Sequence, residues 1–232
     1  MSALRRLVVA TSFAALGCTP AEPQPVTQPA PPEQEEELAL EPLTGIWSEV
    51  APLAAPRSGF ATAVTEASVL VAGGLESEAP SASLSHYDPE IGEIGLGALP
   101  APAFGAAAFV RDDVFFIVGG IASTNASPIV PNDTCHRWAE GALAPCATIG
   151  NGPTSHAAAV TADGYGYLVG GLRLIEPASG SFPTMVVQRL DLAADEWRAE
   201  THLPEFRDGA ATFVHGGKLF VVGGRTLDQQ TV

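Results

Sequence analysis

The sequence is poor in positive charge. It has 11 lysine and arginine residues against 26 aspartate and glutamate residues, which gives a formal net charge of −15. An acidic surface repels nucleic acids and anionic lipid head groups, and the chain contains no basic stripe that would offset this repulsion. The composition therefore excludes nucleic acid as a partner. We expect a protein or a glycan instead.

Motifs typical of catalysis and metal binding are also missing. The chain has no Gly-x-Ser-x-Gly elbow, no His-Glu-x-x-His pair and no Asp-x-Asp-x-Asp-Gly ladder. The acidic pair Asp112-Asp113 is interpreted as solvated charge in a turn. The five histidines lie in different contexts, and His156 is interpreted as a structural residue that packs on a strand. We therefore expect no catalytic residue, no metal site and no cofactor.

No apolar run is long enough to cross a bilayer as a helix. The apolar segment from Leu7 to Leu16 follows Arg5 and Arg6 and precedes a cysteine, an order typical of a secretory signal peptide over residues 1–18. Residues 19–44 are rich in proline and glutamate, which fix the backbone and repel one another. This segment is predicted to be an extended, disordered tether.

The end of that signal segment has a more specific pattern. Ala15-Leu16-Gly17-Cys18 resembles the lipobox of bacterial lipoproteins, although Ala15 stands where leucine is usual. The resemblance implies lipidation of Cys18 and contact with the membrane only through that lipid anchor. Because Thr19 replaces the aspartate associated with inner-membrane retention, it implies an outer-membrane lipoprotein of a bacterial envelope. Simple secretion is the alternative.

Only three cysteines occur, so assigning Cys18 to lipid leaves Cys135 and Cys146 as a pair in an oxidising compartment. The pair lies symmetrically about Glu140-Gly141, a two-residue hairpin loop, which would place the two cysteines opposite each other on adjacent strands. Cross-strand neighbours have Cβ separations compatible with a disulfide. The spacing therefore predicts a Cys135–Cys146 bond and fits neither a redox motif nor a zinc motif.

What the chain does have is a repeated apolar run that ends in two glycines. The run from Val114 to Gly120 recurs three more times, at intervals of roughly fifty residues, which is the signature of a repeat fold. Its β-branched and aromatic residues predict a strand buried on both faces, and glycine permits positive φ and close approach of a neighbour. We interpret four doublets as structural: Gly73-Gly74, Gly119-Gly120, Gly170-Gly171 and Gly223-Gly224.

Each doublet run belongs to a longer unit. An alanine-rich apolar segment and a short turn precede it, which predicts a β-hairpin, and a third and a fourth segment follow. A helix over residues 190–202 would suit the local propensities, but the same phase of the first unit holds Asp88-Pro89. The fold class is therefore predicted to be all-β over residues 45–232, with repeats near 51–99, 100–149, 150–203 and 204–232.

Four short strands in a repeat of about fifty residues resemble the kelch repeat, whose units form the blades of a β-propeller. The doublets carry this resemblance together with several other positions. Matching residues are Tyr87-Asp88, Leu190-Asp191, Trp197, Arg57 and Arg207. Departures are Ile94 in place of tryptophan, Ala103 and Pro153 in place of arginine, and His156 as the only retained histidine of four.

The resemblance implies a kelch-type propeller whose last repeat is incomplete. Either residues 47–50 supply the outer strand of the last blade, or the chain is a fragment of a longer gene product. Because kelch propellers usually have more blades than four, an incomplete ring or one completed by oligomerisation is favoured. The implied function is an envelope-anchored binding or scaffolding module that recognises a protein through loops 121–133 and 172–183. Alternatives are a carbohydrate-binding or sialate-mutarotase-like propeller, with Arg57 and Arg207 as candidate ring-centre binding residues, and a truncated fragment without independent function.

Overall fold

The computed structural model divides the chain into a unit that ends at Ile46 and a unit spanning Trp47–Val232. The structure describes residues 45, 47–65, 69–124, 131–152, 154–176 and 180–226. The predicted signal peptide, Cys18 and most of the predicted tether lie outside the described residues. Within the described residues, no helix is long and apolar enough to span a bilayer.

Every regular element in the described part of the chain is a β-strand, and the strands form antiparallel sheets. The first sheet contains β2 (Ala61–Val64), β3 (Val69–Ala72), β6 (Ser83–Asp88) and β7 (Gly92–Ala98). The second contains β8 (Ala107–Arg111), β9 (Val114–Val118), β10 (Cys135–Ala139) and β11 (Ala142–Pro145). The third contains β13 (Ala158–Ala162), β14 (Tyr165–Val169), β17 (Val186–Asp191) and β18 (Glu196–His202).

A fourth sheet has two described strands, β19 (Ala211–His215) and β20 (Lys218–Val222). Two small sheets flank the larger ones on the side of the glycine doublets. One consists of β1 (Arg57–Ser58), β4 (Leu75–Glu76) and β5 (Ala79–Pro80). The other consists of β12 (Thr154–Ser155), β15 (Leu172–Glu176) and β16 (Gly180–Pro183). The strands β17 and β18 confirm that residues 190–202 are not helical.

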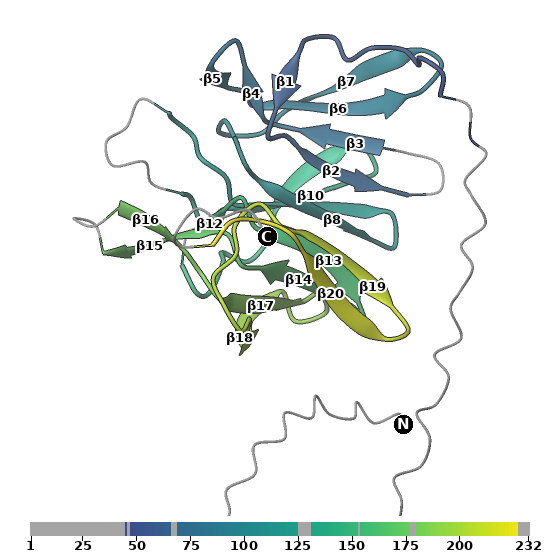
Figure 1. Ribbon diagram of the computed structural model, residues 1–232. Coiled ribbons are helices and arrows are strands. Elements are labelled where there is room, and N and C mark those ends of the chain that lie inside the picture. Colours follow the sequence, from purple (N-terminus) through teal and green to yellow (C-terminus); the bar gives the residue numbers. More distant parts are fainter. Residues whose placement is uncertain are drawn as a thin grey trace, which may run out of the picture. The chain divides into compact units, whose positions relative to one another are not determined.

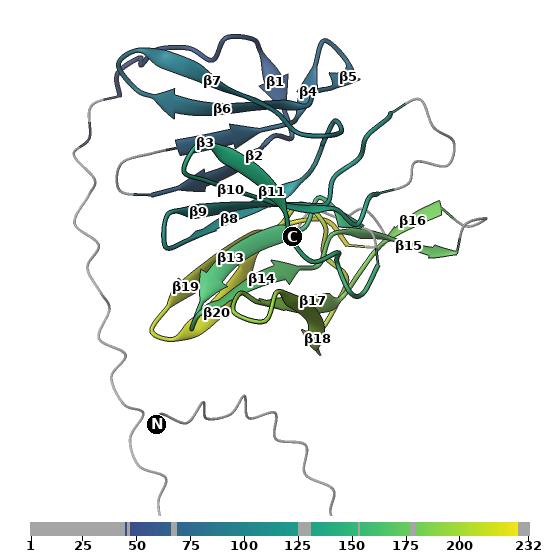
Figure 2. The same cartoon turned by 180° about the vertical axis from the view of Figure 1, so that it is seen from behind.

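The four sheets that begin with β2, β8, β13 and β19 follow one another around a common centre (Figure 1, Figure 2). Their first strands β2, β8, β13 and β19 lie side by side and surround a hollow of about 290 Å³. The walls of this axial hollow are mostly alanines of the first strands, whose small side chains allow the sheets to meet closely. This radial arrangement is that of a β-propeller, so we call the sheets the first to fourth blades. It confirms the predicted fold class.

The core lies between consecutive blades. Each blade turns one face of its sheet toward the next blade, and the apolar side chains of the two faces interdigitate. Between the first and second blades the cluster includes Ala63, Leu70, Phe115 and Ile117. Between the second and third it includes Phe109, Phe116, Leu168, Leu190 and Trp197, and between the third and fourth Val169, Val187, Leu219 and Val221.

The glycine doublets mark the points where consecutive blades touch. Gly119 has φ +71°, and an added Cβ would lie 2.2 Å from the carbonyl oxygen of Thr154. The N–H of Gly120 donates to that same oxygen at 2.9 Å. The doublet therefore brings the end of one blade against the chain that enters the next one. The same pair of contacts joins Gly73-Gly74 to Ala103 and Gly170-Gly171 to Arg207.

These hydrogen bonds correct the alignment of the repeats at one position. The carbonyl oxygens of Ala103, Thr154 and Arg207 are equivalent acceptors from the second glycine of each doublet. The residue of the third repeat that takes the place of the arginine is therefore Thr154 and not Pro153. The spacing itself is constant, because Arg207 lies seven residues before Val214 and Thr154 lies seven residues before Thr161, which takes the place of Val214 in the strand register. The prediction counted back from Val160, which is one residue too early.

A second correction concerns the tryptophan of the outer strand. Trp197 pairs with Leu190, and the equivalent pair in the first blade is Glu93 with Tyr87. Glu93 therefore occupies the place of the tryptophan, one residue before the predicted Ile94. A carboxylate in the place of a large aromatic ring needs a buried partner of opposite charge, and Arg57 supplies it.

The fourth blade differs from the others in its exposed face. Phe213 and Phe220 stack with ring centroids 5.1 Å apart, as Phe109 and Phe116 do at 4.8 Å in the second blade. The pair in the second blade is 4% and 7% exposed because the third blade covers it, whereas Phe213 and Phe220 are 47% and 39% exposed. The prediction that every doublet run is buried on both faces is therefore wrong for β20.

The segment before the first blade also differs from one of the two predicted arrangements. Residues 47–50 form no strand, and Trp47 is 99% exposed. The N–H of Ala51 donates to the carbonyl of Pro89 at the turn between β6 and β7, and the hydroxyl of Tyr87 donates to the carbonyl of Ala51. The segment thus contacts the first blade and adds no outer strand to the last one.

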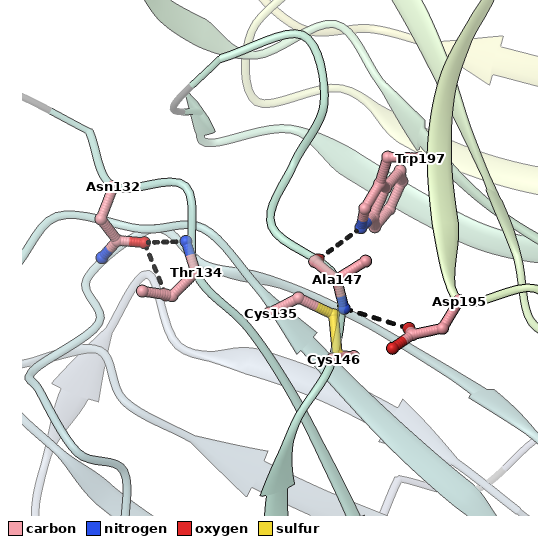
Figure 3. The surroundings of a disulfide bond; sticks show 7 residues. All are labelled: Asn132, Thr134, Cys135, Cys146, Ala147, Asp195 and Trp197. Carbon is pink, nitrogen blue, oxygen red and sulfur yellow. Dashed lines mark hydrogen bonds between the residues drawn. A yellow bond between two sulfur atoms is a disulfide. The ribbon is translucent and has the colours of Figure 1, made fainter.

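Cys135 and Cys146 form the predicted disulfide, with Cα atoms 5.1 Å apart (Figure 3). Glu140 and Gly141 both have positive φ, at 51° and 80°, as a two-residue hairpin turn requires. The residue after the second cysteine, Ala147, accepts a hydrogen bond from the indole N–H of Trp197 at 3.0 Å. The disulfide therefore closes the outer edge of the second blade beside its contact with the third.

Removing this disulfide is expected to destabilise the protein. The bond closes a loop between cysteines 11 residues apart, and closing a loop of that size in the unfolded chain contributes about 3 kcal/mol. The Cys135→Ala/Cys146→Ala variant should lose this amount in urea unfolding, and a reducing agent should affect the parent protein only. A loss below roughly 1 kcal/mol would contradict the expectation.

Candidate functional site

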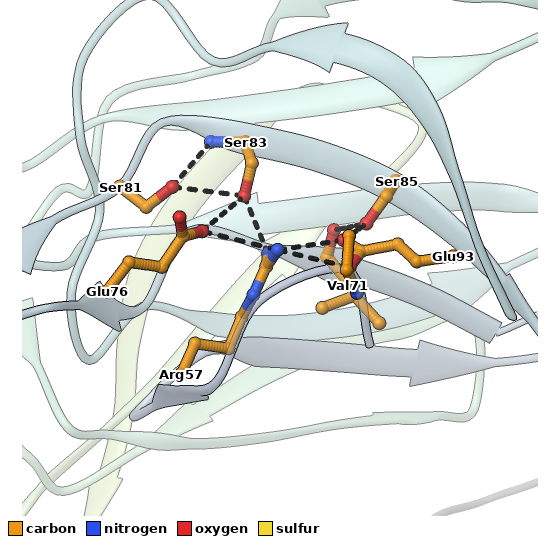
Figure 4. A network of polar contacts seen from close by, with 8 residues as sticks. Arg57, Val71, Glu76, Ser81, Ser83, Ser85 and Glu93 are labelled. Carbon is orange, nitrogen blue, oxygen red and sulfur yellow. Dashed lines mark hydrogen bonds and ion pairs between the residues drawn. The ribbon is translucent and has the colours of Figure 1, made fainter. Parts of the chain in front are cut away.

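Arg57 lies in a buried polar network of the first blade (Figure 4). Its guanidinium is 3.0 Å from Glu93 and 3.2 Å from Glu76, and it donates to the hydroxyl of Ser83 at 2.6 Å. The side chains of Arg57 and Glu93 are only 3% and 5% exposed. The guanidinium is thus occupied by partners within the blade, and its role there is structural.

Burial of Glu93 opposes its charged form and raises its pKa, but the partners of the carboxylate lower the pKa by more. Hydrogen bonds from the hydroxyl of Ser85 and the N–H of Ala54, together with the charge of Arg57, hold the pKa of Glu93 below its usual value of 4.5. The network therefore contains an ionised carboxylate at neutral pH. It joins the segment before the first blade to β6 and β7.

Arg207 occupies the equivalent place at the start of the fourth blade. It donates to the carbonyl of Gly223 at 3.2 Å and forms an ion pair with Glu205. Neither Arg57 nor Arg207 lines the axial hollow, whose walls are alanine and threonine side chains, Phe60 and backbone. The two candidate ring-centre arginines are therefore absent from the walls of this hollow.

His156 packs between the second and third blades near the centre. The imidazole ring of His156 meets the ring of Phe104 edge to face at 5.0 Å, and the backbone N–H of His156 donates to the carbonyl of Gly105. Burial lowers the pKa of His156, and the nearby charge of Asp208 opposes that shift. The imidazole is therefore neutral at pH 7, in agreement with the structural interpretation. Among the described residues, no group of three or more acidic, histidine or cysteine side chains could hold a metal ion.

A pocket opens beside one of the two loops expected to make contacts. The segment predicted as the loop 172–183 is a hairpin, β15–β16, which projects from the third blade (Figure 1). Its strand β15 pairs with β12, so the hairpin is held against the propeller. The pocket has a volume of about 260 Å³. We call it the loop-side pocket; it is lined by Arg173, Phe182, Pro183, Thr184, Met185, Val186, His202 and Phe206.

The floor of the loop-side pocket is rigid. Thr184 is buried, and its N–H donates to the carbonyl of Gly171, the second glycine of a doublet. Its hydroxyl accepts from the N–H of Val186, the first residue of β17. The rim includes Phe182, which is 36% exposed, and the Nε of Arg173 is buried without a hydrogen-bond partner. The loop-side pocket is therefore largely apolar, with the guanidinium of Arg173 at its edge.

The sequence did not identify most of this pocket. The loop 172–183 was singled out for its length, but three lining residues lie outside it. Met185 immediately precedes β17, His202 ends β18, and Phe206 belongs to the connection to the fourth blade. These positions are separated in the sequence and converge only when the blade folds. Of the other expected contact loop, 121–133, residues 125–130 lie outside the described residues.

Comparisons with known proteins agree with the repeat pattern. No family model matches the chain. A stretch of 88 residues is 32% identical to Kelch-like protein 33 of Homo sapiens and covers 38% of this chain and 16% of that protein. The solved structure of YjhT matches with a TM-score of 0.64 and 14% sequence identity, over 76% of this chain and 65% of that chain. This chain therefore spans only part of the length of either protein.

The radial blades, the glycine doublets and these two likenesses together define the class of the protein as a repeat β-propeller. More specifically, the repeats are of the kelch type.

Proposed function

We propose that the protein is an envelope-anchored binding module that recognises a protein partner through the loop-side pocket. The observation that carries this proposal is the largely apolar loop-side pocket at the base of β15–β16, which has Phe182 and Phe206 in its wall and Arg173 at its edge. Kelch propellers generally mediate protein interactions, which supports a protein partner. Anchoring is proposed from the signal and tether pattern of residues 1–44.

The chemistry of the pocket favours a short extended segment of a partner. Aromatic side chains and methionine provide large contact areas at protein interfaces, and a rigid blade leaves its projecting loops free to bind. A guanidinium whose Nε lacks a partner gains by pairing with a carboxylate or a backbone carbonyl. The partner would insert an apolar side chain between Phe182 and Phe206 and offer an oxygen to Arg173.

The test is quantitative capture from envelope extract with the full-length protein. The Phe182→Ala/Phe206→Ala variant should retain less than a tenth of the partner bound by the parent protein. The matched control is Ile91→Ala, since Ile91 is 72% exposed at the distant turn between β6 and β7. It should bind like the parent. Melting temperatures of all three proteins verify folding.

Two treatments of the extract separate the partner classes. Digestion with protease should abolish capture, while digestion of glycans should leave it unchanged. Capture that survives protease and is lost with the glycans would overturn the proposal in favour of a carbohydrate-binding propeller.

In the same cells, Cys18→Ser should move the protein from the membrane fraction to the soluble fraction; unchanged membrane association would contradict lipid anchoring.

A further inference from the structure

A second groove lies between the second and third blades, at the end opposite the loop-side pocket. That pocket adjoins Val186, where β17 begins, and the groove adjoins Leu192, just beyond its last residue. Its volume is about 430 Å³. We call it the inter-blade groove; the second blade supplies Arg111, Asp112, Val114, Phe116, Arg137, Ala139, Ala142 and Ala144, and the third blade supplies Leu192.

The third blade shows what the second blade lacks at this place. Arg137 of β10 pairs with Phe116 of β9, and Arg189 of β17 pairs with Tyr167 of β14, so the two arginines are equivalent. The side-chain partners of Arg189 include Tyr165 and Glu200. Its guanidinium lies 4.3 Å from the centre of the Tyr165 ring, and its Nε is 3.2 Å from the carboxylate of Glu200.

Neither partner has a counterpart in the second blade. Val114 stands in the place of Tyr165, because it opposes the last residue of the neighbouring first strand in the same register. The outer strand β11 ends in Ala144-Pro145 and offers no acidic side chain where β18 has Glu200. Arg137 is exposed and makes no hydrogen bond or ion pair within the described residues.

In the inter-blade groove, Arg137 therefore lacks both the aromatic ring and the carboxylate that contact Arg189 in the third blade. Its walls are apolar, because Val114, Phe116 and the three alanines line them. Arg111 is held by Asp112 at 2.8 Å, so the two guanidinium groups and one carboxylate leave one net positive charge in the groove. This charge stands out on a chain whose formal net charge is −15, and it favours an anionic ligand.

We propose that the inter-blade groove binds a small aromatic carboxylate. The carboxylate pairs with the edge of the Arg137 guanidinium, as Glu200 pairs with Arg189, and the ring packs against the flat face of the guanidinium and the apolar wall, as Tyr165 does. A guanidinium is suited to both contacts, because its planar fork matches a carboxylate and its face attracts a π-system. This site is separate from the loop-side pocket.

The test titrates the full-length protein with 3-phenylpropanoate, with 3-phenylpropanol and with acetate, and follows binding by calorimetry. The phenylpropanoate should bind, the alcohol should bind at least tenfold more weakly because it lacks the charge, and acetate should not bind measurably. Equal affinity for the acid and the alcohol, or no binding of the acid, would overturn the proposal.

Three variants locate the binding. Arg137→Gln should weaken binding of 3-phenylpropanoate at least tenfold, and Val114→Tyr should do the same because it restores to the groove the ring of the third blade. Arg198→Gln is the matched control, since Arg198 is an exposed strand arginine paired with Glu196, and its affinity should equal that of the parent. Unchanged affinity in Arg137→Gln, with an unchanged melting temperature, would refute the site.

Discussion

Gly119→Ala is expected to unfold most of the protein or to prevent its folding. The new Cβ would lie 2.2 Å from the carbonyl oxygen of Thr154 at a residue with φ +71°. The left-handed backbone and the collision with a fixed carbonyl should together cost more than about 3 kcal/mol. The carbonyl oxygen of Thr154 is held in place, because it already accepts a hydrogen bond from the N–H of Gly120. Urea unfolding followed by circular dichroism measures the loss.

Gly217→Ala is the matched control for this experiment. Gly217 has φ +69°, nearly the value of Gly119, but nothing lies within 4 Å of the place of an added Cβ. It should therefore lose only the backbone contribution of about 1–2 kcal/mol. The difference between the two variants isolates the contact between blades. If Gly119→Ala loses no more than Gly217→Ala, the doublets do not hold consecutive blades together.

Arg57→Ala should cause the second large loss of stability. It would leave the carboxylate of Glu93, whose side chain is 5% exposed, without its buried cation. Removing one partner of a buried ion pair typically costs roughly 3–5 kcal/mol. Combining Arg57→Ala with Glu93→Gln should recover part of this loss, because the unpaired charge is then gone. Chemical unfolding of the single and double variants tests both statements.

An exposed ion pair provides the control for Arg57. The side chains of Arg198 and Glu196 are 61% and 53% exposed, so solvent screens their interaction. Arg198→Ala should not change the unfolding midpoint measurably. If Arg57→Ala is as stable as Arg198→Ala, the network of the first blade does not stabilise the fold.

The same network predicts the response to acid. Because the folded protein holds the pKa of Glu93 below 4.5, this carboxylate stabilises the fold at pH values above its unfolded pKa. The contribution is lost as the pH falls through the lowered folded pKa. The stability of Arg57→Ala should fall less steeply over that acidic range than that of the parent. Equal slopes in unfolding experiments between neutral and acidic pH would exclude this coupling.

Local sequence patterns predicted most of the framework. A run such as 114–120 is apolar at every position and stops at glycine, which suits a buried strand, and the turn Glu140-Gly141 placed Cys135 opposite Cys146. Repetition added the information that excluded a helix over residues 190–202. These features depend on residues close together in the chain, so they could be recognised before any packing was known.

The candidate sites were harder to predict, for a physical reason. Arg57 was a candidate ring-centre residue, and nothing in its local sequence indicated that it is buried against Glu93, which takes the place of a tryptophan. Met185, His202 and Phe206 converge in the loop-side pocket from separate segments. Such contacts depend on which blade covers each face of a strand. The alternation of side chains along a strand predicts its two faces but does not predict which blade covers them.

The sequence by itself determined the repeated strand pattern, the positions of the glycine doublets and the pairing of the two cysteines, because each is written in short-range spacing. Only the tertiary structure decided which apolar faces are covered and which arginines have partners. Phe109 and Phe213 have the same local surroundings, yet one is 4% and the other 47% exposed. The difference is the presence of a covering blade, and Arg137 and Arg189 differ for a similar reason: the residues around them come from other strands.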